Sequence, residues 1–183
     1  MQKLLRLSKI IDRINQSIGQ LTLWLVLIMI LVGVWNVIGR YLGNAIGQNL
    51  TSNSLIEAQW YLFDIIFLVS AAYALKHNEH VRVDLLYNGW PPKRKALVNL
   101  IGTLLFLIPF SILAIYFSWQ AVYNSWAILE ASPDPDGLPR YPIKTMIPIA
   151  FALLILQGIS EGIKNFAIFT GKLPSREEKR DAL

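Results

Sequence analysis

Asp64 has the position most suggestive of chemistry, because it lies near the middle of an apolar segment from Leu55 to Leu75. If that segment spans a membrane, an ionisable side chain at such depth is costly and a functional candidate by default. At helical spacing, one face of the segment carries Glu57, Trp60, Tyr61, Asp64 and Leu68. Asp64 lies about 10 Å along the helix axis from Glu57. Its carboxyl group either relays a proton or an ion, or forms a hydrogen-bonded contact to a neighbouring helix.

Two further charges flank this region. Arg40 comes at the end of the preceding apolar segment, and Glu57 opens the segment that contains Asp64. A short connection joins the two segments, which places the guanidinium and the carboxylate for pairing across a helical hairpin. The alternative is that both charges face water at the membrane surface.

The chain offers few other groups for catalysis or metal binding. His77 and His80 are its two histidines, and it has no cysteine, which excludes disulfides and thiolate metal sites. His80 and Asp84 are spaced for a local hydrogen bond, but two ligands are too few for a zinc site. Haem ligation in a helical bundle needs histidines within facing helices, whereas both histidines lie in a connection. We therefore expect no enzyme activity and no metal or cofactor bound by this chain.

Four long apolar segments position these residues, at 21–42, 55–75, 96–126 and 143–169. Each reaches the roughly 20 residues that cross a bilayer. Charged residues make up 16% of the chain and the mean hydropathy is +0.44, whereas a typical soluble domain has about 25% charged residues. The sequence therefore predicts a single all-α integral membrane domain over residues 1–183, with four transmembrane helices and a tail at 170–183.

The basic residues predict the orientation of this domain. Fourteen of the 17 Lys and Arg precede the first segment, separate the second from the third, or gather at and after the end of the fourth. The opposite side holds only Arg40, Arg140 and Lys144. Since basic residues favour the cytoplasmic side, both termini are expected there. This topology accounts for the net charge of +5, and we expect no nucleic-acid partner.

Local patterns refine the expected helices. Residues 3–18 alternate basic and apolar positions at helical spacing, which predicts an amphipathic helix on the membrane surface before the first span. Ser54 and Glu57 fit a capping box for the second helix. The third segment is longer than a bilayer requires, and Pro109 is its expected kink site.

Aromatic residues and prolines mark the expected membrane boundaries. Trp and Tyr gather near the segment ends, as in an aromatic belt at headgroup depth: Tyr41, Tyr87, Trp90, Tyr123, Trp126 and Tyr141. The connection 131–141 holds three prolines and two aspartates, which predicts a rigid loop on the non-cytoplasmic side.

The stretch Glu57–Asp84, together with the Arg40-Tyr41 pair that precedes it, resembles the small membrane subunit of TRAP transporters, the tripartite ATP-independent periplasmic carriers. That family's pattern has an Arg-aromatic pair at the end of the first helix and a Glu that opens the second. An apolar run then ends in small residues and a basic position, followed by a His and a Val-Asp pair. This chain has Arg40-Tyr41, Glu57, Ser70-Ala71-Ala72, Lys76 and His80-Val81-Arg82-Val83-Asp84.

Two residues depart from the pattern of these transporters. Asp64 stands where the resemblance implies an apolar or small residue, and Trp60 stands where a basic or polar one is common. Both belong to the face that contains Glu57, so the departures imply that this subunit docks its partner with altered polarity.

The resemblance implies a division of labour in the bacterial inner membrane. A large multi-helix subunit would hold the substrate and sodium sites, and a periplasmic binding protein would deliver an organic acid. This chain would brace the large subunit and help to dock the binding protein. Six residues would then act at helix or subunit contacts: Arg40, Glu57, Trp60, Asp64, His80 and Asp84. Arg82 and Trp90 would contact lipid or the partner.

Two other functions remain open at this point. A self-sufficient, homo-oligomeric transporter would use Asp64 as its proton-coupling acid, although the chain lacks the internal repeat usual in such carriers. A membrane anchor for a redox enzyme would bind haem or quinone, and the position of the histidines disfavours haem.

Overall fold

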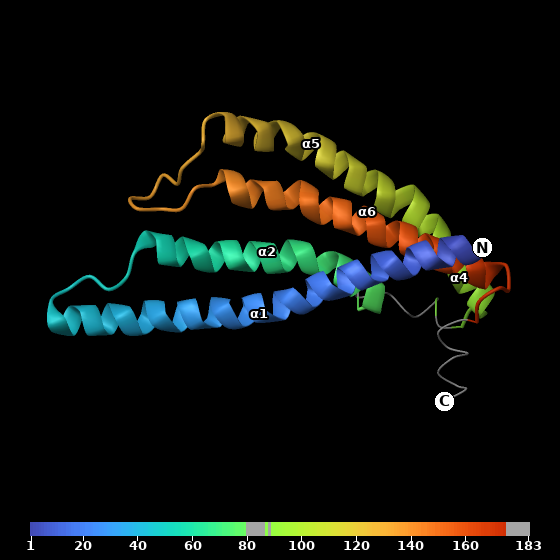
Figure 1. Cartoon of the computed structure of the whole chain (residues 1–183), viewed down its shortest axis with the longest axis horizontal. Helices are drawn as coiled ribbons and strands as arrows, with labels where there is room; N and C mark the ends of the chain where they lie inside the picture. The colour runs from blue at the N-terminus through green and yellow to red at the C-terminus, as the bar shows by residue number, and fades with distance from the viewer. Residues whose placement is uncertain (80–86, 88, 175–183) are drawn as a thin grey trace.

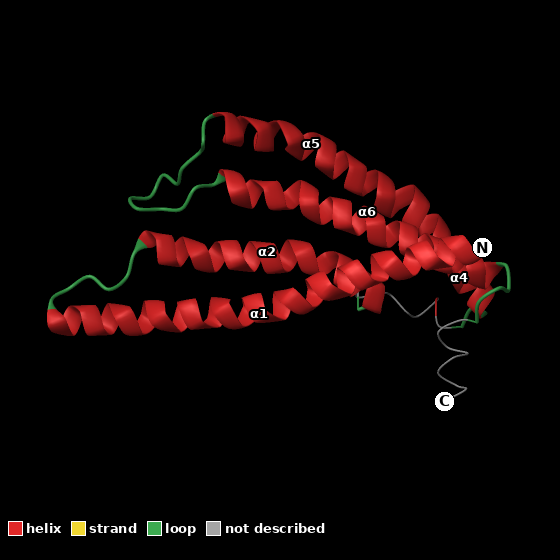
Figure 2. Ribbon diagram, in the orientation of Figure 1, coloured by secondary structure: helices red, strands yellow, loops and turns green. Residues whose placement is uncertain are grey.

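The structure, a computed structural model, describes residues 1–79, 87 and 89–174, and its regular elements there are all helical (Figure 2). These elements are α1 (Gln2–Ile46), α2 (Asn53–His77), α4 (Pro92–Gly102), the π-helical turn η1 (Thr103–Leu107), α5 (Ile108–Ala127) and α6 (Tyr141–Phe169). Four helical runs are long and apolar enough to cross a membrane: α1, α2, the continuous run Pro92–Ala127, and α6. The predicted all-α membrane class is confirmed, and each run contains one predicted span.

The four runs lie side by side in one layer, in the order α5, α6, α2 and α1 (Figure 1). Packing follows the same order, with α5 against α6, α6 against α2, and α2 against α1. The first residues of α1 and the end of α6 lie at one end of the layer, which we call the terminal end. The α1–α2 and α5–α6 connections lie at the opposite end, the loop end.

Helix α1 corrects one prediction, because residues 2–46 form a single helix of 45 residues and no separate surface helix precedes the span. At about 1.5 Å per residue it measures about 68 Å, roughly twice the hydrocarbon thickness. The expected apolar face of its first turns is divided: Leu4, Leu7 and Ile14 are each 45% exposed, whereas Ile11 is 6% exposed. The helix continues because its polar face finds partners on α6, which Figure 1 shows it crossing.

The beginning of α2 differs from the expected capping box. Ser52 is the N-cap, and its side chain accepts a hydrogen bond from the Leu55 backbone N–H at 3.4 Å. Ser54 instead donates to the backbone oxygen of Asp136 at 2.6 Å. The preceding turn is tight, because a Cβ on Gly43 would lie 2.4 Å from the backbone oxygen of Gln48.

The long third span is irregular where the sequence placed its kink. The π-helical turn Thr103–Leu107 precedes Pro109, which lies in the first turn of α5. Because proline lacks an N–H and its ring crowds the carbonyl four residues earlier, a widened turn there relieves both problems. Pro109 therefore marks the irregular site, which extends over the preceding turn.

The side chains buried inside the layer are mostly small or polar. The largest fully buried side chains are Gln157, Asn15, Ser8, Ser111, Ser125 and Ser160. Large apolar side chains cover the outside instead, as expected where lipid rather than water is the solvent. Hydrogen bonds and close backbone approach therefore hold the helices together, and these contacts define the sites described next.

Candidate functional site

Glu57 anchors a contact between α2 and the α5–α6 loop at the loop end. Its side chain is buried, with the residue 3% exposed. The carboxylate accepts a hydrogen bond from the Ser132 hydroxyl and one from the Leu138 backbone N–H, the latter at 2.5 Å. A buried carboxylate requires such donors because desolvation is otherwise strongly unfavourable.

Three more α2 side chains bind the same loop. Asn53 Nδ2 donates to the Pro135 backbone oxygen at 3.0 Å, Ser54 donates to Asp136, and the Tyr61 hydroxyl donates to the Leu138 backbone oxygen at 3.4 Å. We call this set of contacts the loop clasp: Asn53, Ser54, Glu57 and Tyr61 of α2 with loop residues 132–138. It fixes an irregular loop whose backbone would otherwise have few partners.

The structure corrects the predicted Arg40–Glu57 pair. Arg40 is exposed on α1, and within the described part of the chain the hydrogen bonds to Glu57 come from the loop. The sequence suggested pairing because α1 and α2 are adjacent along the chain. Glu57 binds the loop instead of Arg40 because the loop brings a hydroxyl and a backbone N–H to the buried carboxylate. Arg40 keeps its charge at the surface.

A second acidic group supports the loop from its other side. Glu130 accepts hydrogen bonds from Lys144 and from the Ser125 hydroxyl, the latter at 2.6 Å. These contacts hold the pKa of the Glu130 carboxyl below its ordinary value. The hydrogen bond from Lys144 has the largest effect and that from the Ser125 hydroxyl follows, while the charges of Lys144 and Arg140 lower the pKa further. The loop is therefore attached both to α2 and to the start of α6.

Asp64 and Trp60 lie apart from the loop clasp. The predicted common face divides: Glu57 and Tyr61 point to the loop, whereas Trp60 and Asp64 are exposed on the outside of α2. Within the described residues, Asp64 therefore does not form the predicted hydrogen-bonded contact to a neighbouring helix. Sequence spacing placed these residues on one broad face, but the neighbouring loop covers only one edge of it.

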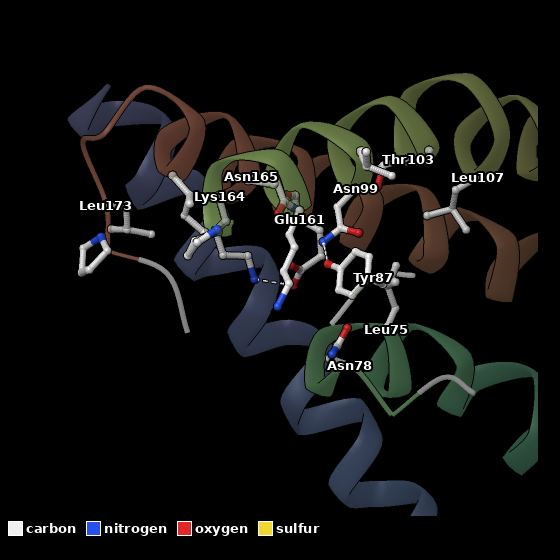
Figure 3. A pocket seen from close by; sticks show the side chains of 17 residues that line it. Leu75, Asn78, Tyr87, Asn99, Thr103, Leu107, Glu161, Lys164, Asn165 and Leu173 are labelled. Carbon is white, nitrogen blue, oxygen red and sulfur yellow. Dashed lines mark hydrogen bonds and ion pairs between the residues drawn. The ribbon is translucent and has the colours of Figure 1, made fainter. Parts of the chain in front are cut away.

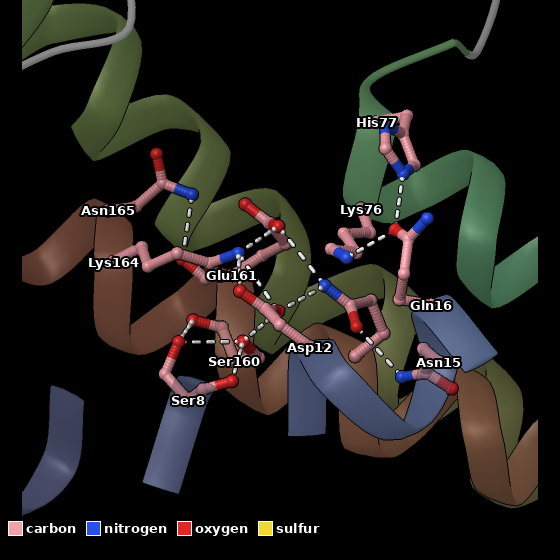
Figure 4. Close-up of polar contacts among 11 residues, drawn as sticks. Ser8, Asp12, Asn15, Gln16, Lys76, His77, Ser160, Glu161, Lys164 and Asn165 are labelled. Carbon is pink, nitrogen blue, oxygen red and sulfur yellow. Dashed lines mark hydrogen bonds and ion pairs between the residues drawn. The ribbon is translucent and has the colours of Figure 1, made fainter. Parts of the chain in front are cut away.

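Helices α1 and α6 meet through buried polar side chains near the terminal end (Figure 4). This polar seam consists of Ser8, Asp12 and Asn15 of α1 with Gln157, Ser160, Glu161 and Lys164 of α6. Asp12 lies at its centre and accepts hydrogen bonds from Ser160 at 2.7 Å and Gln157 at 3.0 Å. Lys164 pairs with Asp12 at 3.1 Å and with Glu161 at 2.5 Å.

The polar seam was not among the predicted sites, although the sequence contains a signal for it. Gln157, Ser160, Glu161 and Lys164 follow the spacing i, i+3, i+4 and i+7 on an otherwise apolar helix. Ser8, Asp12 and Asn15 are likewise spaced on one face of α1. Matching polar stripes on two membrane helices predict a hydrogen-bonded contact.

Gln16 extends the polar contacts from α1 to α2. Its side-chain oxygen accepts a hydrogen bond from Lys76 at 2.5 Å and lies 2.9 Å from His77 Nε2. The His77 ring also packs on Tyr73, with ring centroids 4.3 Å apart. His77 therefore has a structural contact at the end of α2.

A cavity of about 580 Å³ opens between α2, α4 and α6 beside the polar seam (Figure 3). Its polar lining includes Asn99, which donates to the Tyr87 hydroxyl at 2.8 Å, and Lys164, which is paired within the polar seam. No cluster of three or more His, Cys, Asp or Glu suited to a metal ion occurs among the described residues. Asn99 and Lys164, two of the polar residues that line the cavity, are therefore already bound to other side chains of this chain.

Trp90 lies just before the start of α4. The Trp90 ring packs near that of Tyr87, and the Arg94 guanidinium lies 4.5 Å from the centre of the Trp90 ring. This cation–π contact occurs within the chain, and the predicted lipid or partner contact of Trp90 stays a prediction. His80, Arg82 and Asp84 lie outside the described residues.

Comparison with known proteins identifies the family of the chain. The family described as "Tripartite ATP-independent periplasmic transporters, DctQ component" matches residues 29–167, which is more than half of the 183 residues. No curated protein and no solved structure matches the chain. The match covers the last part of α1 from residue 29 on, all of α2, α4 and α5, the loop clasp, and nearly all of α6. The chain therefore belongs to the DctQ component family and is a small permease subunit of a tripartite ATP-independent periplasmic transporter.

Proposed function

We propose that this chain braces the large membrane subunit of a sodium-driven importer of organic acids. The observation that carries the proposal is the single open layer, in which each long helix leaves an apolar side uncovered. Family membership supports it, since such transporters work with a large membrane subunit and a periplasmic binding protein. The substrate and sodium sites belong, in this proposal, to the large subunit.

The orientation follows from charge. Lys3, Arg6, Lys9 and Arg13 belong to the first turns of α1, and Lys93, Arg94 and Lys95 belong to α4; both segments lie at the terminal end (Figure 1). Basic residues concentrate on the cytoplasmic side of a membrane. We therefore assign the terminal end to the cytoplasm and the loop end to the periplasm of a bacterial inner membrane.

This orientation gives the loop clasp a role in docking the binding protein. Pro133, Asp134, Pro135 and Asp136 are exposed at the loop end. The hydrogen bonds of Glu57, Asn53 and Ser54 hold the backbone behind them. A pre-ordered loop loses little conformational entropy on binding, which favours a soluble partner that must attach and leave repeatedly.

Reconstitution in sealed vesicles tests this proposal. The large subunit, with and without this chain, is supplied with the binding protein loaded with a radiolabelled organic acid and an inward sodium gradient. We expect sodium-dependent uptake with the complete set and loss of most uptake without this chain. Full uptake without the chain would contradict the bracing role, and uptake by this chain alone would support the self-sufficient transporter.

Vesicles with equal sodium on both sides are the matched control. A proton gradient imposed on these vesicles separates sodium coupling from proton coupling. Uptake that follows the proton gradient would overturn the sodium-driven part of the proposal.

An absorbance spectrum of the purified chain tests the redox-anchor alternative, which requires a bound haem or quinone.

A further inference from the structure

Exposed side chains of α2 form one narrow stripe. Between Asn53 and Lys76 the exposed residues are Trp60, Phe63, Asp64 and Phe67. Their spacing of i, i+3, i+4 and i+7 places them on a single helix face. All other residues in this range are buried or half-buried, because α1, α6 and the loop cover the remaining sides. We call these four residues the α2 stripe.

The aromatic members of the α2 stripe form an ordered apolar surface. Trp60, Phe63 and Phe67 are 59%, 56% and 68% exposed. The rings of Phe63 and Phe67 are stacked, with centroids 6.2 Å apart and an interplanar angle of 14°. Large aromatic side chains with few rotatable bonds are typical of the centres of protein interfaces.

Asp64 makes this surface unsuited to lipid alone. It lies eleven residues after the start of the 25-residue α2, which places it about 16 Å along the helix and near its midpoint. No hydrogen bond or ion pair to Asp64 occurs among the described residues, although Glu57, seven residues away, has two donors. Acyl chains offer no donor at this depth, so a carboxyl group exposed there requires a protein partner.

We propose that the α2 stripe is the docking surface for a transmembrane helix of the large subunit, which presents a hydrogen-bond donor or a cation to Asp64. This inference rests on the proposed function and assigns that function to one surface. Charge decides between the large subunit and a second copy of this chain. A two-fold contact between copies across the stripe would bring two Asp64 carboxylates together, and like charges oppose such a contact. A partner of different sequence can supply the complementary group.

Substitution of Asp64 separates docking from folding. Asp64→Leu removes an unpaired polar group from the isolated chain, so we expect its thermal stability in detergent to stay the same or rise. In the complex the partner's donor loses its acceptor, so we expect recovery of the large subunit in a tag pull-down to fall about tenfold. Asp64→Asn keeps an acceptor oxygen and should lose less. Phe117→Leu, on α5, is the control and should leave recovery unchanged.

The same experiment distinguishes the inference from the function on which it rests. Failure of the wild-type chain to recover a large subunit would contradict the proposed function itself. Normal recovery with Asp64→Leu would contradict only the assignment of the α2 stripe. A fall in the stability of isolated Asp64→Leu would show that Asp64 has a partner within its own chain.

Cysteine labelling locates the surface directly, because the chain contains no cysteine. Single variants Phe67→Cys and Phe117→Cys, at positions 68% and 74% exposed in the wild-type chain, are labelled with a membrane-permeant maleimide before and after complex formation. We expect the large subunit to protect position 67 several-fold and to leave position 117 open. Protection of position 117 alone would move the interface to α5. Protection of position 67 by homo-oligomers without a large subunit would assign the stripe to a second copy.

Discussion

The Glu57 carboxylate receives its hydrogen bonds from Ser132 and from the Leu138 backbone. Glu57→Gln keeps the shape of the side chain but removes its charge and replaces one acceptor oxygen by a donor. We expect a loss of about 1–3 kcal/mol in the free energy of unfolding. Faster protease cleavage in residues 131–140 should accompany it. Both are measured on the purified chain in detergent.

Arg40→Gln is the matched control for Glu57→Gln, because Arg40 is the partner that the sequence predicted and the structure places at the surface. We expect little change in stability or cleavage. An equal effect of the two substitutions would restore the Arg40–Glu57 pair and contradict the loop clasp.

Glu130 gives the loop a pH dependence. Its pKa is lowered in the folded chain from an ordinary value of 4.5, first by the hydrogen bond from Lys144 and then by that from Ser125. A lowered folded pKa contributes stability above the unfolded pKa, and this contribution is lost as the pH falls through the folded value. Protease cleavage of the loop should therefore increase below about pH 4.5. Glu130→Gln should show faster cleavage near neutral pH and lack this component of the acid response.

Asn36 tests how polar groups are accommodated inside the layer. It is 7% exposed, and neither its amide nitrogen nor its amide oxygen has a hydrogen-bond partner among the residues that the structure describes. Replacing an unsatisfied buried amide by an apolar side chain of similar volume is neutral or stabilising. We expect Asn36→Leu to leave the midpoint of thermal unfolding unchanged or raise it. A clear decrease would contradict the unpartnered environment of Asn36.

At the scale of helices, the polar seam determines how α1 crosses α6. Asp12 and Lys164 are 22% and 19% exposed in their side chains, so water screens their attraction only in part. A double-mutant cycle with Asp12→Asn and Lys164→Met should give a coupling energy of about 0.5–3 kcal/mol. Additive effects of the two substitutions on unfolding would show that the pair does not couple the helices.

The sequence predicted the helices better than their contacts. Apolar length alone located the four spans, because a membrane helix must satisfy its own backbone across the bilayer. Pro109 indicated the irregular turn because proline removes one particular hydrogen bond. The prediction of a separate surface helix was wrong. It rested on the apolar residues at the start of α1, whereas the polar residues Ser8 and Asp12 of the same turns bind α6 and continue the helix.

The loop clasp was harder to predict for a physical reason. Glu57 and Ser132 are separated by 75 positions in the sequence, and hydropathy carries no information about which loop folds back on which helix. The chain-adjacent Arg40 was therefore the natural choice of partner. The polar seam was more accessible to prediction, because both of its polar stripes repeat at helical spacing.

At the scale of the whole molecule, the arrangement in one layer agrees with the role of a subunit. Two residues that depart from the transporter pattern, Trp60 and Asp64, lie on the outer side of α2. The loop clasp occupies the opposite membrane end from the polar seam. The chain therefore has fixed contacts at both ends of the layer, and the proposed partner surface lies between them.

A mild-detergent pull-down of the tagged chain, with mass spectrometry of the recovered proteins, shows whether this chain binds a large transport subunit. We expect the wild-type chain to retain a stoichiometric partner with many transmembrane helices. Recovery of this chain alone, as a stable homo-oligomer, would contradict the role of a brace for a large transport subunit.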